Sequence, residues 1–174
     1  MPNIEQHANQ LLIDSGIKSA PVPVDKIAHR LGIELKFSPA RDDVSGALIR
    51  DGNKAAIAVN SAQHENRQRF TIAHEIGHFR LHRQERLHFD DDFQISFRNS
   101  LSSEAKDRRE IEANQFAAAL LMPRDFLRTD IAQFISGGSD PEDAIQSLAA
   151  KYAVSKRAME LRLLNLGYIS PVDE

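Results

Sequence analysis

The most informative stretch of this 174-residue chain is His74-Glu75-Ile76-Gly77-His78, which sets two imidazoles around one carboxylate. Residues four apart share one face of a helix, so both histidines can direct a ring nitrogen at a single metal ion. Glu75 flanks the same position and can accept a proton without being a ligand. This H-E-x-x-H pattern is typical of zinc-dependent hydrolases. We therefore predict metal ligands at His74 and His78 and a catalytic base at Glu75.

A helix over residues 61–83 is expected to carry the motif. Ser61 follows an apolar run and can cap the helix, while Phe70, Ala73 and Gly77 recur at nearly helical spacing. Gly77 costs about 1 kcal/mol relative to alanine inside a helix, which indicates that a neighbouring backbone comes close there. The alternative, a pair of solvated surface histidines beside a surface glutamate, would leave this glycine and the apolar flanks unexplained.

A catalytic zinc site needs a third protein ligand from another part of the chain. A strongly apolar helix that ends at Pro123 carries two glutamates near its start. Glu110 shares a helix face with small residues, which would let this helix approach Gly77, whereas Glu112 shares its face with bulky Phe116. We predict Glu110 as the third ligand and keep Glu112 as the alternative. Weaker candidates are Glu104, Asp107 and the acidic run 90–92.

Other residues near the motif are expected to have supporting roles. His82 lies one helical turn beyond His78 and should pack or hydrogen-bond nearby. A metzincin would need a third histidine at position 84, which is Gln84, so that subclass is excluded. Peptide hydrolysis also needs a donor that stabilises the tetrahedral intermediate, and His82, Tyr152 and Arg69 are the candidates.

Two segments of the chain, residues 66–82 with the motif and residues 110–123, together resemble the ImmA/IrrE family of metallopeptidases. The resemblance extends from Pro23 to roughly residue 125. It implies a gluzincin-like peptidase core, and the family's Glu-x-x-x-Asn pattern favours Glu110 as a ligand beside His74 and His78, with Glu75 as the base. Characterised members cleave a helix-turn-helix repressor encoded alongside the peptidase. The resemblance therefore implies a regulatory zinc endopeptidase.

We predict an α+β fold with a zincin-like, gluzincin-type core, a small antiparallel sheet, the motif helix and a C-terminal helical segment. The core is assigned to residues 1–125, and the C-terminal segment, packed on that core, to residues 126–174. Within the core, the patterns predict a helix from Ile4, a short helix capped by Asp25, a strand over 33–37, a hairpin formed by 44–49 and 55–59, and a loop with a short strand over 84–109.

Residues Ser45 to Ile49 are our candidate for an exposed strand that binds an extended substrate. Strand addition supplies main-chain hydrogen bonds with little demand on sequence, which suits a peptidase. The alternative is an ordinary edge strand without this function.

The C-terminal segment raises a rival function, because residues 148–163 resemble a helix-turn-helix with Ser155 capping the second helix. DNA binding is the corresponding hypothesis. Residues 141–174 hold four basic and five acidic residues, a net charge of −1, and the whole chain carries −3. Nucleic-acid-binding modules usually have the opposite balance, so we predict no direct nucleic-acid contact. A catalytically silent interaction module is the third alternative.

Composition restricts the setting of this chemistry. The chain has no cysteine, no apolar stretch of 18 residues and no basic N-terminus followed by an apolar run. We therefore predict a cytoplasmic protein without a membrane segment. Zinc is the favoured metal for a His/His/Glu set, with manganese or iron possible. The expected partner is a protein substrate, namely a helix-turn-helix repressor.

Overall fold

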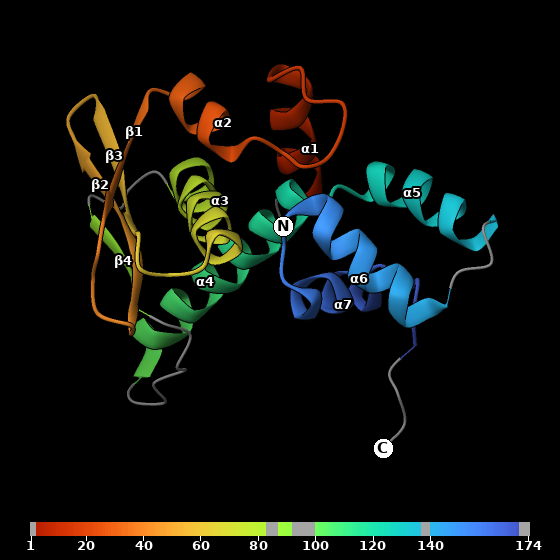
Figure 1. Ribbon diagram of the computed structural model, residues 1–174. Coiled ribbons are helices and arrows are strands. Elements are labelled where there is room, and N and C mark those ends of the chain that lie inside the picture. Colours follow the sequence, from red (N-terminus) through yellow and green to blue (C-terminus); the bar gives the residue numbers. More distant parts are fainter. Residues whose placement is uncertain (1–2, 83–86, 92–99, 137–139, 171–174) are drawn as a thin grey trace.

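The computed structural model describes residues 3–82, 87–91, 100–136 and 140–170, which contain a mixed α+β arrangement. A sheet stands at one side, α3 and α4 cross the middle, and α5 to α7 lie on the opposite side (Figure 1). The helices are α1 (Ile4–Asp14), α2 (Val24–Arg30), α3 (Glu65–Leu81), α4 (Ser100–Leu121), α5 (Arg124–Ser136), α6 (Pro141–Tyr152) and α7 (Lys156–Asn165). The strands are β1 (Ile33–Ser38), β2 (Val44–Asp51), β3 (Lys54–Asn60) and β4 (Leu87–Asp91).

The sheet has the strand order β1-β3-β2-β4 and is mixed. Strands β2 and β3 form the predicted antiparallel hairpin, but β1 pairs with β3 in parallel, with Ile33 opposite Ala55. The prediction of an antiparallel sheet is therefore wrong. The reason is topological: β2 reverses the direction of β1 without pairing with it, and β3 reverses again to fill the position between them.

Strand β2 lies inside the sheet and not at its edge. Gly46 is opposite Val59 on β3 and Asp90 on β4, and pairing on both sides continues to Ile49. The backbone groups of this strand are thus already used in the sheet, so the prediction of an exposed substrate-binding strand at Ser45 to Ile49 is wrong. Within the described part of the chain, the edge strands are β1 and β4.

Helix α3 carries the H-E-x-x-H motif and begins four residues later than predicted. His64 is its N-cap, and the His64 Nδ1 atom accepts a hydrogen bond from the Asn66 amide at 3.1 Å. Ser61 is not the cap; its amide donates to the carbonyl of Ser38 at the end of β1. The short helix α2 likewise begins at Val24, so Asp25 lies in its first turn and does not cap it.

Helices α3 and α4 run antiparallel and touch at Gly77. A Cβ atom at this glycine would lie 3.2 Å from both the Cα and the carbonyl oxygen of Ala113. The predicted close approach of a second backbone is therefore confirmed, and that backbone belongs to α4. The fully buried Phe116 lies one turn further along α4 and contacts the same point, which anchors the two helices to each other.

The last two helices, α6 and α7, are joined by a short turn. The hydroxyl of Ser155 accepts a hydrogen bond from the Ala158 amide, which confirms the predicted cap of α7. Tyr152, Met159 and Leu163 are buried and join the same apolar core as side chains of α1, α3 and α4. Among the helices that the structure describes, none combines the length and the apolar composition of a membrane-spanning segment.

Candidate metal centre

Three side chains from the antiparallel pair α3 and α4 converge on one point. The Nε2 atoms of His74 and His78 are 3.1 Å apart. An oxygen of Glu110 lies 3.3 Å from His74 Nε2, and its other oxygen lies 3.6 Å from His78 Nε2. These three residues form a group whose ligand atoms could hold a metal ion.

The spacing of these atoms fits tetrahedral coordination. Zinc binds imidazole nitrogen and carboxylate oxygen at about 2.0–2.2 Å, so two ligands of a tetrahedral ion are separated by about 3.3–3.6 Å. The 3.1 Å between the two Nε2 atoms and the 3.3 Å from His74 Nε2 to one Glu110 oxygen lie close to this range, and the other Glu110 oxygen is 3.6 Å from His78 Nε2. Both histidines are buried, and Glu110 is partly exposed.

Hydrogen bonds behind the two rings hold them in this orientation. His74 Nδ1 lies 2.9 Å from the side-chain oxygen of Asn114, and His78 Nδ1 lies 3.2 Å from His82 Nδ1. His82 Nε2 is 3.1 Å from a carboxylate oxygen of Glu112. One set of tautomers satisfies all three of these hydrogen bonds. In it, the Nδ1 atoms of His74 and His78 donate, and His82 Nε2 donates to Glu112. Both ligand Nε2 atoms are then unprotonated and face Glu110.

Glu112, the alternative third ligand, is engaged elsewhere. Its carboxylate accepts hydrogen bonds from His82 and from Arg108 Nε, each at 3.1 Å. The hydrogen bond from His82 is the main reason why the pKa of Glu112 lies below its ordinary value. The geometry therefore favours Glu110 over Glu112 as a ligand. The side chains of the weaker candidates, Glu104, Asp107 and residues 90–92, lie outside the described part of the structure.

Glu75 occupies the turn of α3 between the two histidines and is fully buried. Carboxylates are almost never buried in this way unless they are paired or have a function. On the sheet side, Arg50 of β2 donates a hydrogen bond from Nη2 to the carbonyl of His78 at 3.0 Å. This hydrogen bond connects the C-terminal part of α3 to the sheet and helps to fix the position of the motif relative to β2.

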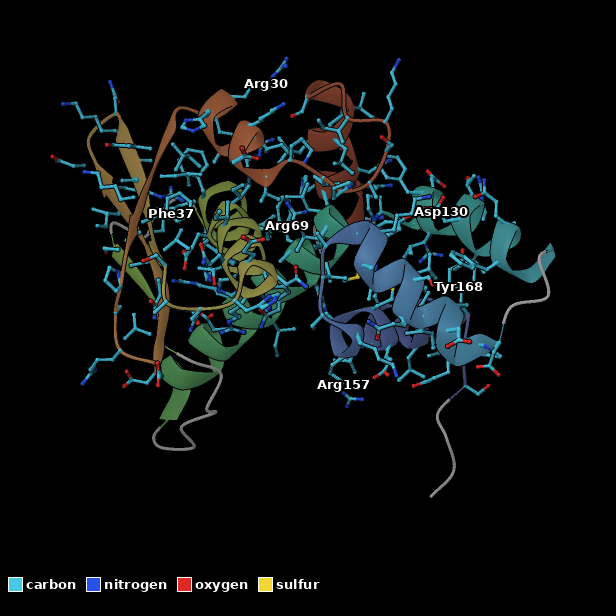
Figure 2. The ribbon with its side chains drawn as sticks, viewed as in Figure 1. Arg30, Phe37, Arg69, Asp130, Arg157 and Tyr168 are labelled. Carbon is cyan, nitrogen blue, oxygen red and sulfur yellow. The ribbon has the colours of Figure 1, made fainter. Side chains whose placement is uncertain are left out.

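The residues considered for stabilising the tetrahedral intermediate have other partners. Arg69 donates to the carbonyls of Val22 and Ala153 at the centre of the molecule (Figure 2). The hydroxyl of the buried Tyr152 donates to Asp130 at 2.8 Å. His82 lies behind His78, as expected of a residue that hydrogen-bonds nearby. The supporting residue that composition and spacing alone did not reveal is Asn114, four residues after Glu110 and so on the same helix face.

Comparison with known proteins shows the family of this chain. Residues 28–164 match the peptidase M78 family, described as the IrrE N-terminal-like domain. The chain belongs to this family. Over 127 residues it is 35% identical to the radiation response metalloprotease IrrE of Deinococcus radiodurans. The match covers 71% of this chain but 34% of that protein, so the chain spans about a third of the length of the relative.

A solved structure shares the fold. A transcriptional regulator of Mycobacterium tuberculosis superposes with a TM-score of 0.64 over 94% of this chain and 47% of that protein. The two sequences are 17% identical, so the likeness concerns the arrangement of helices and strands and not the activity. It extends over almost the whole chain, including the helices after α4.

Proposed function

We propose that this protein is a zinc-dependent endopeptidase. The observation that carries the proposal is the convergence of His74, His78 and Glu110, with separations of 3.1–3.6 Å between their ring nitrogens and carboxylate oxygens. Membership of a metallopeptidase family supports it independently. A His/His/carboxylate set with one open position is the usual form of a catalytic zinc site.

The residues of the site have separate tasks in this proposal. His74, His78 and Glu110 would hold the ion, which supplies Lewis-acid activation of the water and of the peptide carbonyl. Glu75 would accept the proton of the attacking water and deliver it to the leaving amine. Asn114 and the pair His82 and Glu112 would keep the two imidazoles in the tautomer that ligation requires.

Zinc is preferred over other divalent ions because of the donor set. Two imidazoles and one carboxylate suit zinc, while manganese and iron bind similar donors when cells supply them in excess. Metal analysis of the protein purified from cells grown in defined metal mixtures would rank the three ions.

We further propose that the substrate is a helix-turn-helix transcriptional repressor encoded nearby. The resemblance to the ImmA/IrrE family motivates this, and it would make the enzyme a regulatory switch acting in the cytoplasm. A folded helix has its amides and carbonyls already paired, so cleavage requires a loop or a locally opened segment.

The test is to incubate the zinc-loaded protein with the neighbouring repressor and to map the fragments by mass spectrometry. We expect cuts at one or a few positions and only weak digestion of casein. Ready digestion of casein with an intact repressor would refute the repressor as substrate while retaining the peptidase.

A DNA-binding regulator is the second candidate, because residues 148–163 resemble a helix-turn-helix and Ser155 caps α7. The net charge of −1 over residues 141–174 speaks against it. In addition, Met159, Arg162 and Leu163 of α7 face the interior of the protein. A sequence-specific electrophoretic shift at nanomolar protein and physiological salt would favour this second function.

A further inference from the structure

Strand β1 forms one edge of the sheet, because the strand order is β1-β3-β2-β4 (Figure 1). One side of β1 pairs with β3, and within the described part of the chain no strand lies on its other side. The pairing with β3 runs from Ile33 to Ser38 without a bulge, and β1 contains no proline. Bulges and prolines are two devices that prevent an edge strand from pairing further, so this edge is a regular one that can accept another strand.

The backbone groups that β1 offers at this edge belong to its odd-numbered residues. The carbonyl oxygen of Ser38 accepts a hydrogen bond at 3.1 Å from the amide of Ser61, which directly follows β3. The backbone groups of successive residues in a strand point to opposite sides, so the even-numbered residues of β1 face β3. The amides and carbonyls of Ile33, Leu35 and Phe37 therefore point to the edge that β3 does not use.

The side chains of β1 differ between its two faces. On one face, Phe37 is 53% exposed and lies on the sheet side of the molecule (Figure 2). On the other face, Lys36 Nζ lies 3.5 Å from a carboxylate oxygen of Glu34, and these side chains are 62% and 66% exposed. A lysine on an edge strand usually discourages pairing, but the charge of this lysine is balanced by its neighbour on the same strand. The strand thus presents an aromatic ring on one face and one charge of each sign on the other.

We propose that β1 pairs in the antiparallel direction with β1 of a second copy of this chain, so that two sheets become continuous in a symmetric dimer. The two-fold axis passes beside Leu35, which lies opposite the same residue of the other copy. Ile33 of each copy then lies opposite Phe37 of the other, and Glu34 of each lies opposite Lys36 of the other. The odd-numbered pairs exchange backbone hydrogen bonds, and part of the exposed Phe37 ring is covered.

The two charges of β1 select this register and this partner. Residues that lie opposite each other in an antiparallel pair must both face the shared edge, so the register changes only in steps of two residues. A step in one direction places Lys36 opposite Lys36 of the other copy, and a step in the other direction places Glu34 opposite Glu34. Like charges directly opposite each other destabilise a strand pair, whereas opposite charges stabilise it. The strand is therefore complementary to itself in one register.

The expected dimer is weak and leaves each metal centre complete. Two strands of this length bury less than the about 1,200–2,000 Å² of a standard interface, so the dimer should form reversibly in the micromolar range. The metal group belongs to α3 and α4, and α3 is joined to the sheet through Arg50 of β2. Neither copy supplies a residue to the metal group of the other, so the inference does not depend on the proposed peptidase function.

Charge reversal on β1 tests the proposal, with the dimer measured by sedimentation velocity of the full chain from about 1 to about 200 µM. The wild type should change from monomer to dimer across this range. Lys36→Glu and Glu34→Lys each place like charges opposite each other, so each should weaken the dimer about tenfold or more. An equal mixture of the two variants should form a heterodimer, because the acidic strand of one then faces the basic strand of the other. Raised salt should weaken this heterodimer.

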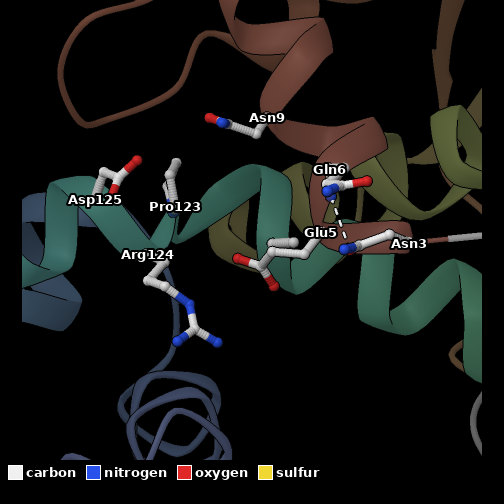
Figure 3. A pocket seen from close by; sticks show the side chains of 8 residues that line it. Asn3, Glu5, Gln6, Asn9, Pro123, Arg124 and Asp125 are labelled. Atoms are coloured by element: carbon white, nitrogen blue, oxygen red, sulfur yellow. Dashed lines mark hydrogen bonds between the residues drawn. The ribbon is translucent and has the colours of Figure 1, made fainter.

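Asp125→Lys and Arg128→Glu are the matched controls, because they make the same charge changes in an exposed ion pair of α5. Their side chains are 64% and 72% exposed, close to the values for Glu34 and Lys36. Asp125 borders a cavity of about 320 Å³ beside the start of α1, and no residue of the sheet lines this cavity (Figure 3). Neither control should change the dimer. Equal effects of the controls and of the β1 reversals would overturn the proposal.

The apolar contact is tested by Phe37→Ser, with Ile13→Ser on α1 as control, where Ile13 is 62% exposed. Phe37→Ser should weaken the dimer about three- to fivefold, because the ring no longer packs against Ile33 of the other copy. Ile13→Ser should have no effect. All variants should unfold at the wild-type temperature when measured at about 1 µM, where the protein is monomeric, because each change is at an exposed side chain.

Three results would overturn the proposal. The first is a wild-type protein that stays monomeric at the highest concentration. The second is a dimer that both charge reversals on β1 leave unchanged, which would place the interface on another surface. The third is a mixture of Lys36→Glu and Glu34→Lys that associates no better than either variant alone, because self-complementary pairing of β1 requires the mixed pair to form.

Discussion

Gly77→Ala tests the contact that brings the metal ligands of two helices together. The new methyl group would lie 3.2 Å from the Cα and carbonyl oxygen of Ala113 and from a ring carbon of Phe116. Two of these three neighbours are backbone atoms, which cannot rotate away, so α4 must shift by a few tenths of an ångström. Glu110 lies on α4 one turn from Ala113 and therefore moves with α4. His74 and His78 lie on α3 and keep their positions.

The expected size of the effect follows from two opposing contributions. Overpacking a well-filled site costs about 1–3 kcal/mol, and alanine gains about 1 kcal/mol over glycine inside a helix. We therefore expect Gly77→Ala to lower the free energy of unfolding of the metal-free protein by about 1 kcal/mol. Because the ligand spacing changes, zinc affinity should fall about tenfold, as for other changes just outside the ligands.

Urea unfolding of the metal-free protein and zinc competition with a chromophoric chelator measure the two quantities. Gly46→Ala is the contrast: its methyl group would lie 2.5 Å from Thr71 Cγ2 and 2.6 Å from the carbonyl oxygen of Ala58, away from the contact between α3 and α4. It should cost more stability than Gly77→Ala but change zinc affinity less. If Gly77→Ala matches the wild type in both stability and zinc affinity, the reasoning about this helix contact is wrong.

Three further predictions concern the ligands and the C-terminal helices. His74→Ala should lower the zinc content of the purified protein far below one equivalent, because water replaces a lost ligand poorly; an unchanged content by mass spectrometry would move the site elsewhere. Glu110→Gln should weaken zinc binding more than Glu112→Gln in chelator competition, because the Glu110 oxygens face both Nε2 atoms, and the reverse ranking would transfer the ligand role to Glu112. Tyr152→Phe should lower the free energy of unfolding by about 1–3 kcal/mol, because the buried Asp130 loses a donor. Burial first and Asp130 second raise the pKa of Tyr152, so its contribution to wild-type stability is complete below the ordinary tyrosine pKa of about 10 and is lost as pH rises above it. The variant should lack this alkaline loss, and identical pH dependence of urea unfolding in both proteins would contradict the assignment.

The motif helix, the second half of its partner helix and the hairpin were predictable because local patterns determine them. The start of α4 at Ser100 was not, because residues 100–109 were predicted to lie in a loop. The apolar spacing around the motif predicts α3, and the single glycine at Gly77 predicts that a backbone lies against it, which proves to be that of α4. The preference for Glu110 over Glu112 came from the same reasoning, because small neighbours on one helix face allow the close approach. The turn at Asp51 to Lys54 likewise predicts the antiparallel pairing of β2 with β3.

The strand order depends on contacts between distant residues, which periodicity does not report. Nothing in residues 33–60 distinguishes β1 beside β2 from β1 beside β3, and that choice decides whether the sheet is antiparallel or mixed. The pairing of β2 with β4 also depends on residues about 40 positions further along the chain. The start of α3 was predicted wrongly for a local reason. Both Ser61 and His64 can accept a hydrogen bond from an amide of the first helical turn, and only the path of the chain after β3 selects His64.

The most direct test of a metal-dependent peptidase centred on α3 is hydrolysis by Glu75→Gln at equal zinc content. The amide has the shape of the carboxylate but cannot accept a proton from water, so the variant should bind one equivalent of zinc and the substrate while losing at least about a hundredfold in turnover. The assay follows cleavage of the neighbouring repressor by mass spectrometry, with metal content measured on the same samples. Full zinc loading with nearly complete loss of cleavage is the predicted result. Cleavage by the variant at the wild-type rate would contradict the account.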